Sequence, residues 1–262
     1  MKFTRLLFIM GASLAAAVGC SEEVSLDFHK EGNCWQMSQA QFDKFAKKLS
    51  KANPEEADAL IDRVYTIADS LSAAEQDGTF LVFADAMEHT FYQVDSPLRN
   101  DDLYLRVLDR ESRCNSLMST DYRRIDWKEH ILRANAVGSE VVDLPVSDIN
   151  GEETSLHRLI DEQTVLLVYG EDCKACTKLM NEAVNSSKFK KAAEDGQLRL
   201  LSLYIGEDGE EFAAKSAVLK DWANFIDARQ LVRYENAFDS RLVPSLYLIS
   251  DKKMVKVKGT LS

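Results

Sequence analysis

Two cysteines separated by two residues, Cys173 and Cys176, stand where a buried strand passes into a helix. The apolar run 165–169 has no polar interruption, which is typical of a strand that is buried on both faces. A glycine and two acidic residues end this run, and helix-forming residues with apolar side chains at helical spacing follow the second cysteine. We therefore expect the pair at the first turn of a helix that leaves a sheet.

This position has chemical consequences for the first cysteine. The first turn of a helix has unpaired backbone N–H groups and a partial positive charge, which lower the pKa of a thiol. Lys174 acts in the same direction, whereas Glu171 and Asp172 oppose it. We expect a nucleophilic Cys173 that attacks a partner disulfide and a Cys176 that resolves the mixed disulfide.

Two other interpretations of the pair stay open. A single Cys-x-x-Cys can form half of a zinc site, but the sequence has no second such pair and no His-x-x-x-His. The pair could also form an inert structural disulfide. Its place at a strand-to-helix turn, with Val243-Pro244 opening a later apolar strand, favours the redox role. We expect neither a cofactor nor a bound metal.

Residues 1–19 are typical of a secretory signal, with basic residues followed by an apolar stretch that is too short to span a membrane. The stretch ends Ala17-Val18-Gly19-Cys20, which resembles a bacterial lipobox. We expect cleavage before Cys20 and lipid attachment to its thiol. The alternative is an ordinary signal peptide with a chance cysteine. We expect a lipid-anchored protein of the cell envelope, and we favour the periplasmic side over the cell surface.

The charge balance excludes two classes of partner. Removal of residues 1–19 takes away Lys2 and Arg5, so the formal net charge of −11 becomes −13. A chain this acidic is a poor match for nucleic acid or for an anionic membrane surface. Contact with a membrane is therefore expected through the lipid alone.

Two cysteines remain, Cys34 and Cys114. In an oxidising compartment they are a possible structural disulfide. Such a bridge would stabilise the fold by about 3–5 kcal/mol through its effect on the unfolded chain. Two thiols that stay reduced and buried are the alternative.

The chain divides into four segments: a signal peptide (1–19), a tether (20–36), a helical domain (37–136) and a domain of alternating strands and helices (137–262). The helical domain is predicted to be all-α, because apolar stripes at helical spacing recur between short joins. Its predicted helices cover 38–52, 54–71, 80–94, 100–108 and 120–136. In the second domain we predict strands at 165–169, 198–205, 245–250 and 254–258, and a helix over 210–226.

Several short motifs carry a family resemblance. From residue 137 the chain contains Val137-Gly138-Ser139-Glu140, Asp143-Leu144, Asn150-Gly151 and Ser155-Leu156, and then the strand with its Cys-x-x-Cys. This order resembles the opening of extracytoplasmic thioredoxin-like proteins of the TlpA/ResA type. In the helical half, Ser96-Pro97-Leu98-Arg99-Asn100 resembles the DUF5106 domain that is fused to such proteins in Bacteroidetes lipoproteins.

The resemblance implies an α/β thioredoxin-like fold after the all-α domain. It also implies a cis peptide bond at Val243-Pro244, beside the cysteines, where it shapes a groove for an extended substrate. Near neighbours of this groove are expected to be Tyr169, Glu171, Asp172 and Lys174.

The implied activity is that of a thiol–disulfide oxidoreductase. It would reduce disulfides of periplasmic or envelope proteins and receive electrons from another protein. Two alternatives are a redox-silent binding or assembly lipoprotein that uses the same fold, and a metal carrier that uses the thiol pair.

The sequence departs from the family pattern in three places. Asp172 stands where the family often has tryptophan, and Leu167 stands where many thioredoxins have a buried aspartate. The fold normally closes with a helix after its last hairpin, whereas this sequence ends at Ser262. We therefore expect one face of the sheet to be partly uncovered.

Overall fold

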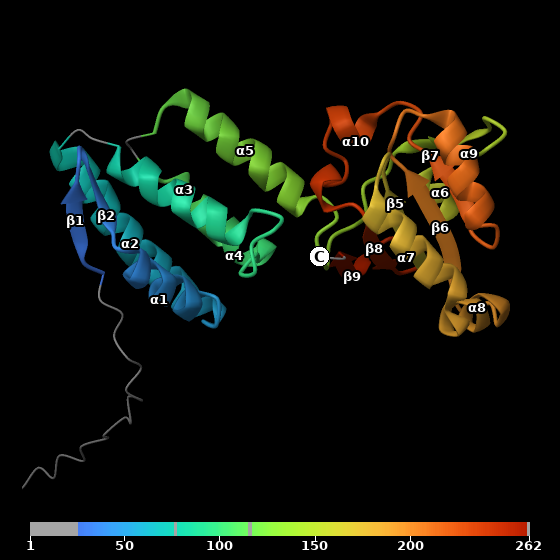
Figure 1. Cartoon of the computed structure of the whole chain (residues 1–262), viewed down its shortest axis with the longest axis horizontal. Coiled ribbons are helices and arrows are strands. Elements are labelled where there is room, and N and C mark those ends of the chain that lie inside the picture. Colours follow the sequence, from blue (N-terminus) through green and yellow to red (C-terminus); the bar gives the residue numbers. More distant parts are fainter. Residues whose placement is uncertain (1–25, 76–77, 115–116, 261–262) are drawn as a thin grey trace, which may run out of the picture.

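The computed structural model describes residues 26–75, 78–114 and 117–260, and it shows two lobes that lie side by side along the long axis (Figure 1). The predicted signal peptide and Cys20 lie outside the described residues. In the described part of the chain, no helix is long and apolar enough to cross a membrane. The first lobe consists of β1 (Phe28–Glu31), β2 (Cys34–Met37), α1 (Gln39–Leu49), α2 (Pro54–Glu75), α3 (Thr79–Phe91), α4 (Asp101–Glu111) and α5 (Ser119–Arg133).

The β1–β2 hairpin corrects the predicted tether. Its strands pair antiparallel with Phe28 opposite Met37, and a glycine with positive φ makes the turn between them. The hairpin packs on the helices, because the N–H of Trp35 donates to Oγ1 of Thr79 at 2.8 Å and the ring of Phe28 lies 6.1 Å from that of Phe83. These contacts order the segment from Phe28 on, ahead of Cys34 and Trp35, where the sequence indicates that the tether becomes ordered.

Side chains at the helix starts explain where the helices begin. Ser38 and Gln41 form a capping box before α1. Asn53 accepts the N–H of Glu56 at 3.0 Å ahead of Pro54, and Asn100 accepts the N–H of Leu103 at 3.0 Å before α4. Each cap satisfies a backbone donor that the helix itself leaves unpaired.

An aromatic cluster fills the first lobe. Phe83 lies at its centre, with ring centroids 5.1 Å from Tyr65, 5.9 Å from Phe42 and 6.1 Å from Phe45. The hydroxyl of Tyr65 donates to the buried carboxyl of Glu111. Burial raises the pKa of this carboxyl to about 7 against the opposing effect of the Tyr65 hydrogen bond.

The possible disulfide between Cys34 and Cys114 is not formed in the described part of the structure, which leaves both as thiols. Cys34 opens β2, and its Sγ lies 3.6 Å from the point where a Cβ on Gly78 would stand. Cys114 is buried after α4, and its Sγ lies 3.0 Å from Oδ1 of Asp69. The hairpin and the helices hold the two sulfurs in different surroundings.

In the described part of the second lobe, a seven-stranded sheet has the order β4-β3-β7-β6-β5-β8-β9. Its strands are β3 (Pro145–Ser147), β4 (Glu153–Ser155), β5 (Thr164–Tyr169), β6 (Arg199–Tyr204), β7 (Ala223–Ile226), β8 (Ser245–Ile249) and β9 (Val255–Thr260). The helices are α6 (Leu156–Leu159), α7 (Lys174–Asn185), α8 (Ser187–Glu194), α9 (Gly209–Val218), α10 (Leu231–Tyr234) and the 3-10 turn η1 (Ser240–Leu242). Helices cover both faces of the sheet (Figure 1).

Strand β5 lies inside the sheet, parallel to β6 and antiparallel to β8. Its residues alternate between two cores: Leu166 and Val168 face one side, and Val165, Leu167 and Tyr169 face the side covered by α7 and α9. Because β8 runs the opposite way, the residues that follow β5 lie next to those that precede β8. This pairing brings the Cys-x-x-Cys turn close to Pro244.

The predicted helix over 210–226 was too long. Helix α9 ends at Val218, and residues 223–226 form β7 between β3 and β6. The side chain of Asn224 donates to the carbonyls of Leu219 and Trp222 at 3.1 and 2.8 Å, which closes the turn between helix and strand. The pairing of β7 with β3 and β6, which lie far away in the sequence, overrides the local helical pattern.

An apolar strip lies on the outer part of the sheet, where the sequence predicts a partly uncovered face. Leu246 and Leu248 of β8 are half-buried on the side of α7. Val257 of β9 pairs with Leu248 and is 54% exposed.

Candidate active site

The two cysteines of the Cys-x-x-Cys turn form a disulfide with an S–S distance of 2.04 Å. Cys173 is the N-cap residue of α7, and its Sγ accepts the N–H of Cys176 at 3.0 Å. Cys173 is half-buried, whereas Cys176 is 0% exposed among the apolar side chains beneath α7. Only the first sulfur can therefore be reached by a second protein.

The cis peptide bond at Val243-Pro244 lies on the side of the turn that faces β8. A Cβ on Gly170 would lie 3.6 Å from Cγ2 of Val243, so the side chain of Val243 packs against the backbone of Gly170. Cys173 and Val243 also pack against the same apolar cluster. The reactive turn and Val243, the residue before the cis proline, thus lie side by side.

An ion pair on α9 supports the turn from below. Lys215 Nζ donates to the carbonyl of Gly170 at 2.8 Å and lies 2.5 Å from Oε1 of Glu211. Glu211 also accepts the hydroxyl of Tyr204 at 3.1 Å and the backbone N–H of Asp172. Hydrogen bonding from Lys215 lowers the pKa of Glu211. The pair fixes the backbone on which Cys173 stands.

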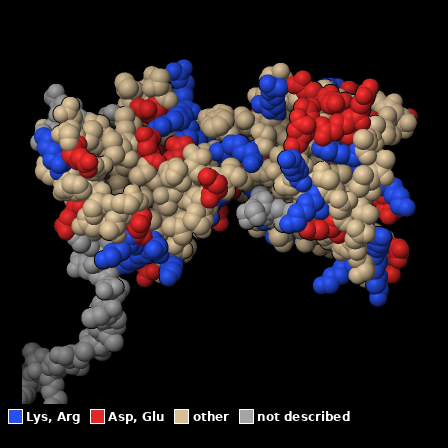
Figure 2. Space-filling view, viewed as in Figure 1, with Lys and Arg blue, Asp and Glu red and all other residues tan. Residues whose placement is uncertain are grey.

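Exposed acidic side chains surround the disulfide and form what we call its acidic rim. Glu171 and Asp172 are exposed just before Cys173, and Oε1 of Glu171 accepts the N–H of Asp208 at 2.8 Å. The loop that Glu171 contacts adds exposed acidic residues, Glu207, Asp208 and Glu210. Figure 2 shows a dense group of acidic side chains on this lobe. Negative charge here opposes the stabilisation of a thiolate by the helix.

Comparisons with known proteins cover both lobes. Residues 30–135 match the model of a domain of unknown function, DUF5106. A crystal structure of a thioredoxin-like protein from Bacteroides caccae superposes with a TM-score of 0.73 at 20% identity, over 85% of this chain and 79% of that chain. The chain joins a DUF5106 domain to a thioredoxin-like domain.

Two further solved structures match about half of the chain. A conserved protein of unknown function from Bacteroides fragilis has 29% identity and a TM-score of 0.44, over 48% of this chain and 93% of that chain. The thioredoxin domain of a thiol-disulfide oxidoreductase from Bacteroides vulgatus has 14% identity and a TM-score of 0.42, over 48% of this chain and 90% of that chain. The search for similar curated proteins gives no match.

The thioredoxin-like domain places most of the predicted site residues around one surface. Lys174 is exposed beside Cys173, Val243 is half-buried, and Pro244 is buried. Tyr169 differs from the prediction. It is buried on the α9 side of β5, with its ring 5.4 Å from that of Tyr204, so it does not line an open groove. Burial raises its pKa to about 12.

Sequence reasoning missed Lys215 and Glu211, which lie on α9, more than 30 residues after the cysteines. An acidic and a basic residue four apart are common on helices, so their spacing carries no functional signal. Among the described residues, no group of three or more His, Cys, Asp and Glu side chains is placed to hold a metal ion.

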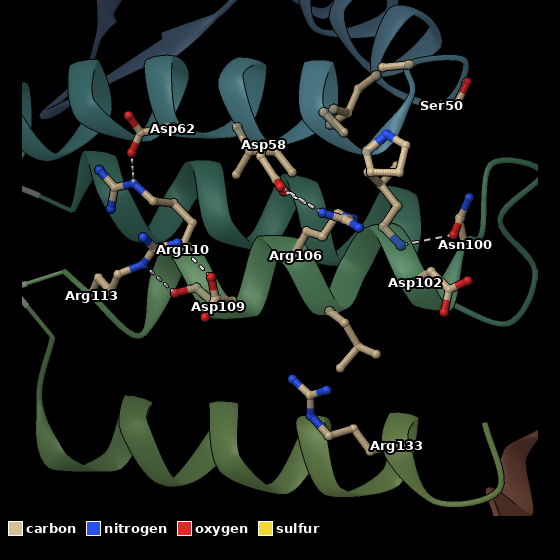
Figure 3. Close-up of a pocket in the computed structure, with 17 residues that line it drawn as sticks. Ser50, Asp58, Asp62, Asn100, Asp102, Arg106, Asp109, Arg110, Arg113 and Arg133 are labelled. Carbon is tan, nitrogen blue, oxygen red and sulfur yellow. Dashed lines mark hydrogen bonds and ion pairs between the residues drawn. The ribbon is translucent and has the colours of Figure 1, made fainter. Parts of the chain in front are cut away.

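The DUF5106 domain has a groove of about 770 Å³ between α2 and α4, closed at one side by Arg133 of α5. Figure 3 shows Arg106 and Arg110 of α4 turned toward aspartates of α2. Arg106 lies 2.8 Å from Asp58, and Arg110 lies 2.8 Å from Asp62. The groove is polar, and its cations are already paired with carboxylates.

Proposed function

We propose that the protein catalyses thiol–disulfide exchange with protein substrates. The observation that carries this proposal is the unequal burial of the two sulfurs at the start of α7. Cys173 is accessible and caps the helix, whereas Cys176 is enclosed beside it. An exposed attacking sulfur with a sheltered resolving sulfur is the arrangement that exchange through a mixed disulfide requires.

The exchange proceeds in two balanced steps from the reduced protein. The Cys173 thiolate attacks one sulfur of a substrate disulfide, and the other substrate sulfur leaves as a thiolate. Cys176 then loses its proton and attacks Sγ of Cys173, which releases the second substrate thiolate. The products are a reduced substrate and the Cys173–Cys176 disulfide seen here. Two electrons pass to the substrate, and a protein dithiol must restore them.

The direction of exchange and the cellular address belong to the same proposal. The family resemblance favours a reductant of envelope proteins, and the signal-like start favours export with a lipid on Cys20. Labelling cells with a radioactive fatty acid tests the anchor. We expect label on the wild-type protein and none on Cys20→Ala. Equal label on both proteins would refute lipidation at this residue.

The activity is tested by insulin reduction with dithiothreitol as electron source. We expect turnover by the wild type and by Cys34→Ser, a control at a cysteine in the other domain. Cys173→Ser should lose turnover, because the remaining cysteine of the pair, Cys176, is enclosed and cannot meet a protein substrate. A Cys173→Ser variant as active as the wild type would refute the proposal.

A second candidate function is binding without redox chemistry, and the groove on the DUF5106 domain favours it. A groove of this size lined by arginine and aspartate suits a polar ligand such as an extended charged peptide. Titration with a library of charged peptides, followed by isothermal calorimetry, tests it. This candidate expects binding that Arg106→Ala weakens and that Cys173→Ser leaves unchanged. The absence of any bound peptide would refute it.

A further inference from the structure

The segment that leads into the cis proline, residues 235–244, is held from outside its own domain. Asn135, in the connection after α5, is 1% exposed and donates its side-chain N–H to the carbonyl of Ala237 at 2.6 Å. The same side chain accepts the N–H of Val142 at 2.7 Å. Near the end of α5, Nε2 of His130 lies 3.1 Å from the carbonyl oxygen of Glu235.

A further contact is a stack between Arg241 and Tyr92. The guanidinium carbon of Arg241 lies 4.1 Å from the centroid of the Tyr92 ring, close enough for a cation–π interaction. Tyr92 is 2% exposed and stacks on the ring of Tyr104, with 4.9 Å between centroids. A buried aromatic pair in the DUF5106 domain thus forms the floor under an arginine of the thioredoxin-like domain.

Charged groups hold the guanidinium of Arg241 over the ring of Tyr92. Asp239 is buried and accepts two hydrogen bonds from Arg241, at 2.9 and 2.8 Å. Burial alone would raise the pKa of Asp239, but hydrogen bonds and charge from Arg241 hold that pKa below its usual value. Across the interface, Arg99 lies 3.6 Å from the carboxylate of Asp239 and donates to the carbonyl of Tyr92.

The acidic residue Asp101 completes the contact between the domains. Its carboxylate lies 2.7 Å from Arg99 and 3.4 Å from Nζ of Lys258 on β9. The network therefore joins the start of α4 to the loop before β8 and to β9. It leaves Arg241 little freedom to turn away from Tyr92.

Arg241 stands three residues before Pro244, and the single turn η1 links them. The N–H of Leu242 donates to the carbonyl of Asp239 at 3.0 Å, and the N–H of Arg241 donates to Oδ1 of Asp239 at 3.2 Å, so Asp239 closes this turn. Val243 follows this turn directly, and its side chain borders the reactive turn, so a shift of Arg241 would displace it. The DUF5106 domain thus contacts the loop that leads to the cis proline beside the reactive turn.

We propose that Tyr92 and Arg99 are positioning residues for the cis-proline loop. Through Arg241 and Asp239 they set the affinity of the thioredoxin-like domain for extended protein substrates, while the sulfur chemistry proceeds unchanged. This inference rests on the proposed exchange function. It assigns to the DUF5106 domain a role in substrate recognition at a site that it does not itself contain.

Kinetics with two substrates test the proposal. In Tyr92→Leu we expect KM for insulin to rise about tenfold while kcat stays within about twofold of the wild type. The variant should lose binding energy that the bound substrate and the transition state share. Turnover of hydroxyethyl disulfide should not change, because this substrate is too small to contact the cis-proline loop. Tyr92→Phe keeps the ring face and should restore the wild-type KM. Tyr122→Leu, an aromatic change on α5, is the control.

A second variant guards against misfolding. Arg241→Lys keeps the charge and loses the planar stack, so it should raise KM for insulin in the same direction. Wild-type KM in both Tyr92→Leu and Arg241→Lys would overturn the proposal.

Hydrogen exchange separates this proposal from the proposed function. We expect amides of residues 239–246 to exchange at least about fivefold faster in Tyr92→Leu than in the wild type and Tyr122→Leu. Unchanged exchange overturns the positioning role, whatever the activity. A wild type that lacks turnover, together with faster exchange in Tyr92→Leu, refutes the exchange function and supports the positioning of the loop.

Discussion

Cys176 donates its backbone N–H to Sγ of Cys173 at 3.0 Å, so the first cysteine caps the helix that carries the second. In the oxidised protein this contact holds a sulfur of the disulfide. After reduction, the same N–H faces the sulfur on which negative charge develops. The geometry thus favours the thiolate of Cys173 over that of Cys176, which is enclosed in apolar surroundings.

Reactivity toward an alkylating agent should differ between the two reduced thiols. At pH 7 we expect iodoacetamide to modify Cys173 at least about tenfold faster than Cys176, because helix capping lowers one pKa and burial raises the other. Quenched time points analysed by peptide mass spectrometry give both rates. Equal rates in the folded protein would contradict the assignment of roles.

Neutralising the acidic rim should make Cys173 more reactive. Asp172 has φ of +45°, a conformation that asparagine tolerates, so Asp172→Asn removes charge with little backbone strain. We expect the pKa of Cys173 to fall, and the difference from wild type to shrink at high salt. The pH dependence of alkylation measures it. Asp221→Asn, an exposed change after α9, is the control. An unchanged pKa would show that the rim charge does not reach the sulfur.

Local sequence patterns predict the reactive turn well. A buried apolar strand, a break and a Cys-x-x-Cys before helix-forming residues all lie within one short stretch, so strand β5 and helix α7 appear where expected. The helix starts at Ser38 and Asn100 are equally local. By contrast, the hairpin β1–β2 and strand β7 depend on partners far along the chain, and the sequence around them indicates a tether and a helix.

Loss of the ion pair under the turn should destabilise the thioredoxin-like domain. Lys215→Met removes the donor to the Gly170 carbonyl and leaves Glu211 without its cation, so we expect a loss of about 2 kcal/mol in the free energy of unfolding. The double variant Lys215→Met/Glu211→Gln should recover part of the loss. Urea unfolding measures both, with the exposed Lys190→Met on α8 as control. A Lys215→Met protein of wild-type stability would contradict the supporting role.

The buried carboxyl of Glu111 should make the stability of the DUF5106 domain depend on pH. Its pKa is raised from 4.5 to about 7, so the folded state keeps a proton that the unfolded chain has lost. Stability should therefore fall by about 3 kcal/mol as the pH rises from 4.5 through 7, and level off above. Urea unfolding across this range should show the slope in the wild type and in the exposed control Glu55→Gln, but not in Glu111→Gln. A slope that persists in Glu111→Gln would assign it to another group.

The contact between the domains shows what local patterns cannot reveal. Tyr92 fits a helical stripe and Arg241 lies in a loop, and nothing in the spacing of 149 positions joins them. Lys215 and Glu211 likewise reach the reactive turn only because α9 packs beneath β5. Contacts of this kind follow from the packed fold and not from periodicity.

Trapping of the mixed disulfide tests the exchange function most directly. Cys176→Ser keeps the attacking sulfur and cannot resolve the intermediate, so reduced Cys176→Ser incubated with insulin should accumulate a covalent adduct. We predict that peptide mass spectrometry finds the adduct on Cys173 and that dithiothreitol releases it. No adduct, or an adduct found only on Cys34 or Cys114, would contradict the account.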